Sequence, residues 1–103
     1  MTDFRLTPWA SPEPPTQESL ILLMHAEGLH PYLWSSAPQD LYPAHTHPFD
    51  KIMYCVSGSI TFGLAGKPDA MTLHAGDRLD LPAGTEHDAV VGEQGVVCLE
   101  AHI

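Results

Sequence analysis

The sequence contains few basic residues, and this scarcity excludes two classes of partner. Among 103 residues, four are Lys or Arg and thirteen are Asp or Glu, so the formal net charge is −9. Nucleic acids and anionic membrane surfaces are bound by clusters of Lys and Arg. We therefore expect neither nucleic acid nor a membrane as a partner, and a small-molecule ligand instead.

Long apolar runs and cysteines are also scarce. No stretch approaches the length needed to span a membrane, and the first fifteen residues lack the apolar core of a signal peptide. Cys55 and Cys98 are too few to form a disulfide scaffold. We therefore expect a cytoplasmic protein in which both cysteines are buried free thiols.

The pattern predicts one helix, near the N-terminus. Residues 1–15 are rich in proline and are expected to be extended. A helix is predicted at about 16–28, because Thr16 is a favourable N-cap and Gly28 can adopt the left-handed conformation of a C-cap. The helix is expected to pack through an apolar face made of Leu20, Ile21, Leu23 and Met24.

From Tyr32 onwards the sequence is typical of strands and turns. Short apolar or alternating runs are separated by turn residues such as Ser57-Gly58 and Gly92-Glu93, and no helix is predicted between them. Even spacing of this kind indicates an antiparallel sandwich or barrel. We predict one all-β domain over residues 16–103, preceded by the extended segment 1–15. Its core is expected to include Phe62, Leu64, Leu79 and Leu81.

Three histidines stand out as candidate metal ligands. His45 and His47 lie at alternate positions, so on an extended strand their side chains share one face. Two imidazoles on one face can bind the same metal ion, although an H-x-H pair alone also fits two surface histidines. A third, His87, follows a Pro-x-Gly turn at 82–84.

The two histidine segments resemble the two sequence motifs of the cupin superfamily. The first motif is G, five residues, H-x-H, three or four residues, E, six residues, G. The second is G, five residues, P-x-G, two residues, H, three residues, N. Seven positions at the motif spacings match, namely His45, His47, Gly58, Gly76, Pro82, Gly84 and His87.

This resemblance implies a fold, a metal and a partner. The fold is a double-stranded β-helix, the cupin or jelly-roll barrel, which usually binds one metal ion inside and is usually dimeric. It implies that His45, His47 and His87 bind one divalent transition metal (Fe, Mn, Ni, Zn or Cu) and that the chain forms a homodimer. Three histidines leave coordination positions open for water or substrate, as catalytic metal sites do.

The sequence departs from the cupin motifs at three positions. Gln39 replaces the leading glycine of the first motif, which we interpret as a variation in a turn. Val91 replaces the final asparagine of the second motif and is expected to fill the barrel. Lys51 replaces the glutamate that is normally the fourth metal ligand. This change matters most, because a protonated ammonium has no lone pair with which to bind a metal ion.

Lys51 allows three interpretations. In the first, which we favour, it pairs with Asp50, Glu86 or Glu100 while three histidines and water hold the metal. In the second, Lys51 is a catalytic residue beside the metal, acting as a general base or as a Schiff-base nucleophile. In the third, the metal has been lost, and Lys51 with protonated histidines binds an anion. Asp50 and Glu86 adjoin motif positions and are expected to face away from the site.

Three classes of function remain open at this stage, one of which is an accessory protein whose barrel serves mainly as a dimerisation scaffold. Another is a metal-dependent dioxygenase, isomerase or lyase that acts on a small polar or carboxylated molecule. The third is a non-catalytic sensor or carrier of a small ligand or a metal. Because the cupin fold does not fix a function, the sequence identifies no substrate.

Overall fold

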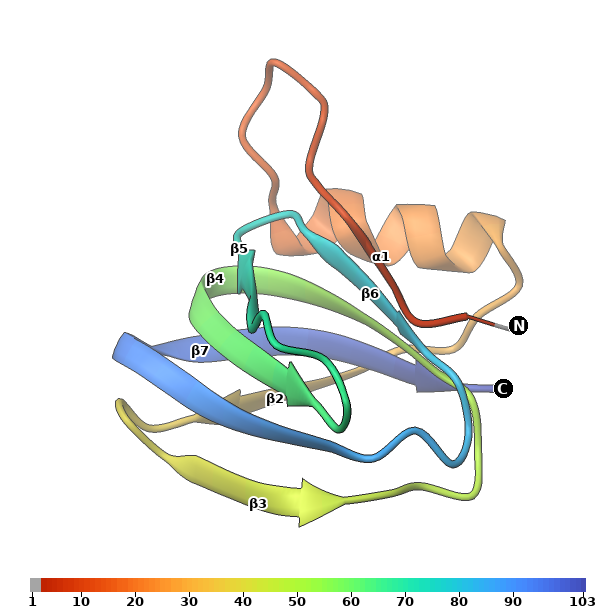
Figure 1. Cartoon of the computed structure of the whole chain (residues 1–103). Coiled ribbons are helices and arrows are strands. Elements are labelled where there is room, and N and C mark those ends of the chain that lie inside the picture. The colour runs from red at the N-terminus through yellow and green to blue at the C-terminus, as the bar shows by residue number, and fades with distance from the viewer. Residues whose placement is uncertain (1–2) are drawn as a thin grey trace.

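The computed structural model describes residues 3–103, which form one helix and seven strands (Figure 1). In chain order the elements are β1 (Arg5–Thr7), α1 (Gln17–Ala26), β2 (Tyr32–Ser36), β3 (Leu41–His45), β4 (Lys51–Leu64), β5 (Met71–His74), β6 (Arg78–Leu81) and β7 (His87–His102). All strand pairs are antiparallel. The predicted all-β class with one N-terminal helix is confirmed.

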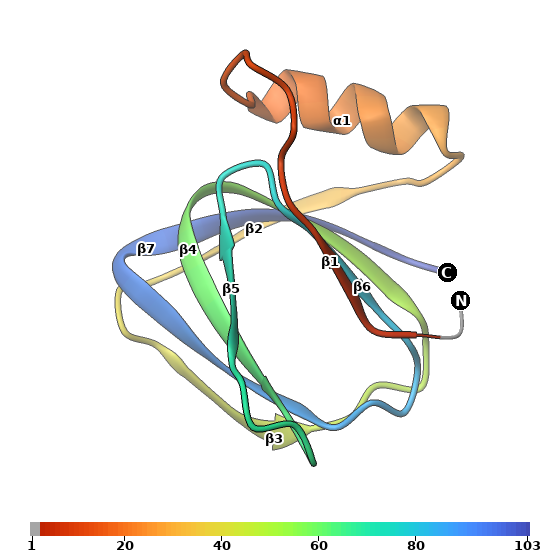
Figure 2. The same ribbon diagram turned by 45° about the horizontal axis from the view of Figure 1, so that its top comes forward.

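The two longest strands, β4 and β7, pair with each other and belong to both halves of the barrel. The sheet has the order β1-β6-β4-β7-β2, while β5 pairs with the second half of β4 and β3 with the first half of β7. In the view of Figure 2 the strands follow one another around a ring, with α1 outside it. This arrangement is the double-stranded β-helix that the motifs predicted.

Both long strands bend instead of ending in turns. The register between β4 and β7 shifts on either side of Ser57-Gly58. Gly58 has a φ of 74°, and a Cβ atom there would collide with the carbonyl of Gly95. A residue without a side chain therefore lets the two strands approach closely while β4 bends. The turns predicted at Ser57-Gly58 and Gly92-Glu93 were wrong, because the chain changes direction there without leaving the sheet.

The hydrophobic residues form two clusters, one inside the barrel and one beneath the helix. All four residues predicted for the barrel core are at most 8% exposed, namely Phe62, Leu64, Leu79 and Leu81. Val91 is buried in the interior cluster as expected. The second cluster joins the helix to the outer face of the barrel and consists of Leu20, Met24, Ile52, Tyr54, Leu99 and Ala101.

The helix is held by the predicted caps but buries a narrower face than predicted. Thr16 and Ser19 form a capping box, and Gly28 has a φ of 77° just beyond the helix end. Leu23 was expected to be buried, and it is 44% exposed. It lies about 100° around the helix from Met24, so it points away from the barrel surface that Met24 contacts.

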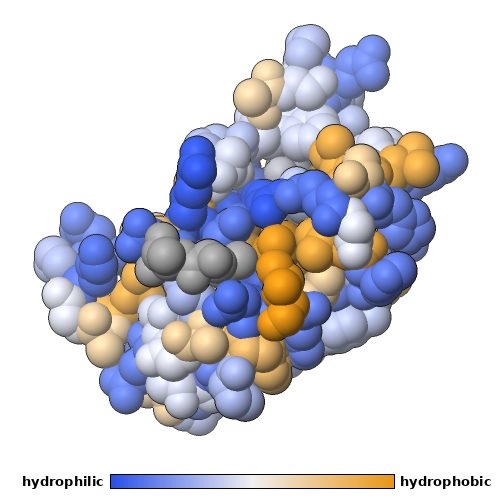
Figure 3. Space-filling model, turned by 90° about the vertical axis from the view of Figure 1, so that its right-hand side faces the viewer, coloured by the Kyte–Doolittle hydropathy of each residue, from blue (hydrophilic) through white to orange (hydrophobic). Residues whose placement is uncertain are grey.

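The proline-rich N-terminal segment contributes an edge strand. Within it, β1 pairs with β6, and the backbone N–H of Trp9 donates to the Asp77 carboxylate at 2.9 Å; residues 1–2 lie outside the described part of the chain. Hydrophilic side chains cover most of the face that carries the two chain ends (Figure 3). Across residues 3–103, no helix is long and apolar enough to cross a membrane.

Candidate metal centre

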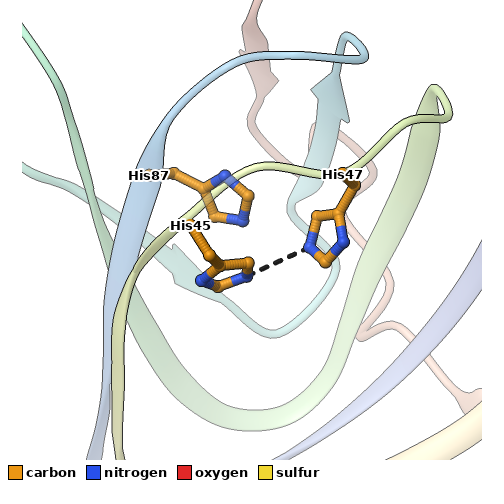
Figure 4. A group of neighbouring side chains, drawn as sticks. All are labelled: His45, His47 and His87. Atoms are coloured by element: carbon orange, nitrogen blue, oxygen red, sulfur yellow. Dashed lines mark hydrogen bonds between the residues drawn. The ribbon is translucent and has the colours of Figure 1, made fainter.

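The three histidines identified in the sequence converge at one place in the barrel (Figure 4). His45 is the last residue of β3 and pairs in register with His87, the first residue of β7. His47 lies two residues beyond the end of β3. The candidate ligand atoms of all three lie within 4.8 Å of one another.

His47 reaches this cluster for a different reason from the one predicted. The expectation rested on strand alternation, but the strand ends at His45. The backbone N–H of Gly84 donates to the carbonyl of His47 at 2.9 Å. The Pro-x-Gly turn of the second motif therefore holds the loop that carries His47, and the two motifs position each other's histidines.

Backbone carbonyls orient two of the three imidazoles. Nδ1 of His45 lies 2.6 Å from the carbonyl of Pro43, and Nδ1 of His87 lies 2.9 Å from the carbonyl of Thr85. Because a carbonyl oxygen only accepts, Nδ1 must carry the proton in both rings. In the neutral form of each ring, Nε2 therefore keeps its lone pair, as in histidines that bind a metal.

The spacing of the imidazoles fits one metal ion. Nε2 of His45 lies 3.1 Å from Nε2 of His47. Two imidazole nitrogens bound to one ion at about 2.1 Å, at tetrahedral to octahedral angles, would be about 3.0–3.4 Å apart. Together with the carbonyl contacts at Nδ1, this separation means that the three histidines could hold a metal.

The electrostatic environment favours neutral imidazoles, which is the form that binds metals. Burial lowers the pKa of His87 below the usual value for histidine. Burial, followed by the positive charge of Lys51, lowers the pKa of His47 in the same direction. Both rings are therefore mainly uncharged at pH 7, and a metal would displace few protons on binding.

Lys51 pairs with one of the three acids considered from the sequence. Its Nζ lies 3.5 Å from Oε1 of Glu100, with side-chain exposures of 10% and 6%. Asp50 instead accepts a hydrogen bond from the backbone N–H of Ala83 at 2.8 Å, and Glu86 is exposed. The favoured interpretation, in which Lys51 turns to a carboxylate, therefore agrees with the structure.

Glu100 is the buried centre of a polar network that extends to the surface at Tyr32 and His102. It accepts hydrogen bonds from the Tyr32 hydroxyl at 2.6 Å and from Nε1 of Trp34 at 3.1 Å, and Nε2 of His102 lies 2.7 Å from it. Burial alone would raise the pKa of Glu100, but the Tyr32 hydrogen bond and the charge of Lys51 outweigh burial, so the pKa is lowered. Glu100 is therefore an anion at neutral pH.

A cavity of about 340 Å³ connects the histidine cluster to this network. This volume lies at the small end of the range for ligand sites, about 300–1,000 Å³. The sequence did not identify Tyr32 and Trp34 as part of the site. The spacing of Tyr32 and Trp34 predicts that they share one face of β2. The register that places this strand beside Glu100 could not be predicted from the sequence. The lining residues are Tyr32, Trp34, Tyr42, His45, His47, Lys51, Met53, Ile60, Phe62, His87, Ala89 and Glu100.

Solved structures with the same fold include enzymes and proteins of unassigned activity. The DMSP lyase DddQ from Ruegeria pomeroyi DSS-3 is 26% identical with a TM-score of 0.63, over 72% of this chain and 37% of that chain. A DUF861 family protein from Thermotoga maritima is 15% identical with a TM-score of 0.64, over 98% of this chain and 100% of that chain. A variant of oxalate decarboxylase from Bacillus subtilis is 19% identical with a TM-score of 0.62, over 70% of this chain and 20% of that chain.

The family itself follows from the sequence match. No curated protein matches the chain, and the chain spans little more than a third of the length of DddQ. The sequence model of the Cupin domain matches residues 32–101, which is most of the chain. These residues include both histidine motifs and the strands of the barrel from β2 to β7. The chain therefore belongs to the cupin family.

Proposed function

We propose that this chain is a metal-dependent enzyme acting on a small carboxylated molecule, with one divalent transition metal (Fe, Mn, Ni, Zn or Cu) held by His45, His47 and His87. One observation carries this proposal. Three imidazoles, two of them oriented by backbone carbonyls at Nδ1, meet at the wall of a cavity that also contains the Lys51–Glu100 pair. A metal centre and a buried cation in one small cavity are suited to an organic acid.

The two parts of the cavity have separate roles in this proposal. A divalent ion at the histidines would polarise a substrate oxygen and lower the pKa of bound water. Lys51 would donate hydrogen bonds to the substrate carboxylate. When Lys51 turns to the substrate, Glu100 still accepts hydrogen bonds from Tyr32, Trp34 and His102. These hydrogen bonds stabilise the negative charge of Glu100 in the absence of the lysine.

A lyase reaction is the first class to test. Two of the structures with this fold are named as a DMSP lyase and an oxalate decarboxylase. The chain covers only 37% and 20% of those proteins. Their activities are therefore starting points for a substrate panel of small organic acids and not assignments.

Metal binding is tested first, on protein purified without an affinity tag, because a histidine tag would bind metal itself. Metal analysis and calorimetric titration with Mn²⁺, Ni²⁺ and Zn²⁺ should find one ion per chain. His87→Ala should weaken binding by more than about 100-fold, since removing a ligand costs more than removing its hydrogen-bond partner. His74→Ala, which changes an exposed histidine, is the matched control and should bind normally. No binding of any of these ions by the wild-type chain would contradict the proposal.

The role of Lys51 is tested next, on the metal-loaded protein. Lys51→Met keeps the length of the side chain and removes the charge. It should retain the metal and lose turnover. Lys51→Glu is unsuitable here, because the new carboxylate would face Glu100 in a buried site. Full activity of Lys51→Met would remove Lys51 from the mechanism.

The second candidate function is a non-catalytic sensor or carrier of a small ligand. It is supported by the pairing of Lys51 with Glu100, which engages the lysine with a carboxylate of the chain itself. This function predicts tight binding of metal and organic acid with no chemical change in the acid. Product analysis by NMR after long incubation separates the two candidates.

We also propose that the chain forms a homodimer in the cytoplasm. The dimer is supported by Leu41 on the edge strand β3, which is 75% exposed, and by its register partner Val90, which is 39% exposed. An exposed apolar pair formed by an edge strand and its neighbour is suited to burial against a second copy. Light scattering should give twice the chain mass for the wild type and a monomer for Leu41→Glu.

A further inference from the structure

Cys55 on β4 and Cys98 on β7 face each other inside the barrel. They are register partners, both are 0% exposed, and both belong to the interior hydrophobic cluster. Both are free thiols. The chain has only these two cysteines, so an intrachain disulfide can join no other pair.

The backbone around Cys55 defines the geometry of this pair. Its N–H donates to the carbonyl of Asp77 at 3.1 Å, and its own carbonyl accepts from the N–H of Gly76 at 2.7 Å. The N–H and the C=O of one strand residue point to the same side of the strand, so neither group of Cys55 bonds to β7. Cys55 and Cys98 are therefore a non-hydrogen-bonded antiparallel pair, with a Cα separation of about 4.5 Å. Disulfides span Cα separations of about 4.4–6.8 Å, so this pair can be bridged without moving the strands apart.

We propose that Cys55 and Cys98 form a reversible disulfide when the protein meets a hydroperoxide. One thiolate attacks a peroxide oxygen, which breaks the O–O bond and gives a sulfenic acid and hydroxide. The other thiol then attacks the sulfenic sulfur, and the S–S bond forms as the hydroxyl group leaves as water. In total the two thiols lose two protons and two electrons, and hydrogen peroxide is reduced to two waters.

The environment of the pair makes this reaction slow but favours its product. The hydrogen bond between the two thiols lowers the pKa of Cys55 and, together with burial, raises that of Cys98. Neither side chain is exposed, so reaction depends on transient opening of the barrel. The bond would join β4 to β7, the strands that carry Lys51 and Glu100. A crosslink between distant parts of the chain restricts the unfolded state, so the oxidised protein should unfold at a higher temperature.

The test is peroxide treatment of the full chain with a chelator present, so that a bound metal does not catalyse oxidation. Thiols are counted with Ellman's reagent after denaturation, and intact masses are measured before and after treatment. Both thiols should disappear together, the mass should fall by two hydrogen atoms, and dithiothreitol should restore both. A non-reduced digest should contain the Cys55 and Cys98 peptides linked. The oxidised protein should also show the higher unfolding temperature.

Two variants control the assignment. Cys98→Ser and Cys98→Ala should each keep the Cys55 thiol or add oxygen to it, without losing two hydrogens; circular dichroism reports whether each is folded. If neither folds, the linked peptides from the wild type still decide the question. The proposal is overturned if the wild type keeps both thiols, if oxygen atoms are added to both cysteines, or if the disulfide joins two chains.

Discussion

Nζ of Lys51 lies 3.5 Å from Oε1 of Glu100. With backbone and side chain taken together, neither residue is more than 8% exposed. The family's glutamate ligand is absent from position 51, and a carboxylate enters the same cavity from β7 instead. The positive charge of Lys51 therefore lies on β4 and the negative charge of Glu100 on β7, and these two strands pair with each other. Three of the five predictions below test what this pairing and its surroundings contribute to stability.

Removing the charge of Glu100 should destabilise the protein strongly. Glu100→Gln keeps a hydrogen-bonding side chain for Tyr32 and Trp34 but leaves the Lys51 ammonium buried without an anion. Loss of one partner of a buried ion pair costs about 3–5 kcal/mol, and we expect about 3 kcal/mol because the amide replaces part of the network. Urea unfolding followed by circular dichroism measures the free energy of unfolding.

A double-mutant cycle isolates the contribution of this pair. Lys51→Met combined with Glu100→Gln should recover much of the loss, since no buried charge is then left uncompensated. Glu93→Gln removes an exposed carboxylate and should change the free energy of unfolding by less than about 0.5 kcal/mol. A loss in the double variant equal to the sum of the losses in Lys51→Met alone and Glu100→Gln alone would mean that the two side chains act independently.

The same carboxylate should make stability depend on pH in the acid range. The pKa of Glu100 is lowered in the folded chain, so it lies below the value of about 4.3 for an unfolded glutamate. The unfolded state therefore binds more protons between the two values. The stabilisation is complete above about pH 4.3 and is lost as the pH falls through the folded pKa.

The measurement for this prediction is a difference between two proteins, because other carboxylates also titrate in acid. The free energy of unfolding of the wild type minus that of Glu100→Gln should be constant from pH 7 to about pH 5. It should shrink as the pH is lowered further. A difference that grows on acidification would mean that the folded state raises the pKa of Glu100.

The cluster of three histidines and the fold could be predicted from the sequence because both are encoded by short-range spacing. The motif positions around His45, His47 and His87 need no knowledge of strand register. The partner of Lys51 could not be predicted in this way. Three acids were possible, and only the pairing of β4 with β7, which sets Met53 opposite Glu100, selects one.

The errors in the sequence predictions have a similar origin. A glycine between two apolar runs reads as a turn, yet at Gly58 it permits a bend within β4, because the strand it contacts is distant in sequence. Leu23 was placed in the buried face of the helix from periodicity alone. The width of the buried face of the helix depends on the barrel surface beneath it, and residues of β4 and β7 form that surface.

The narrow contact between helix and barrel predicts two different effects for the same substitution. Leu20 is 0% exposed in the cluster beneath α1, and Leu22 in the same helix is 62% exposed. Leu20→Ala should lower the free energy of unfolding by about 3 kcal/mol, from lost burial and the resulting cavity. Leu22→Ala should change it by less than about 0.5 kcal/mol. Similar losses in both variants would place Leu22 in an interface between chains.

The conformation of Gln39 explains why the first cupin motif begins with glycine. Gln39 has a φ of 65°, the left-handed conformation that a side chain disfavours by about 1–2 kcal/mol. Gln39→Gly should relieve this strain, partly offset by the greater freedom of glycine in the unfolded chain. We expect a net gain of about 0.5–1 kcal/mol in the free energy of unfolding. The matched control is Gln94→Gly, because Gln94 is also exposed and, among residues 3–103, Gln39 is the one non-glycine with positive φ. Gln94→Gly should give no gain, and a gain of equal size there would show that the effect does not come from the backbone conformation at position 39.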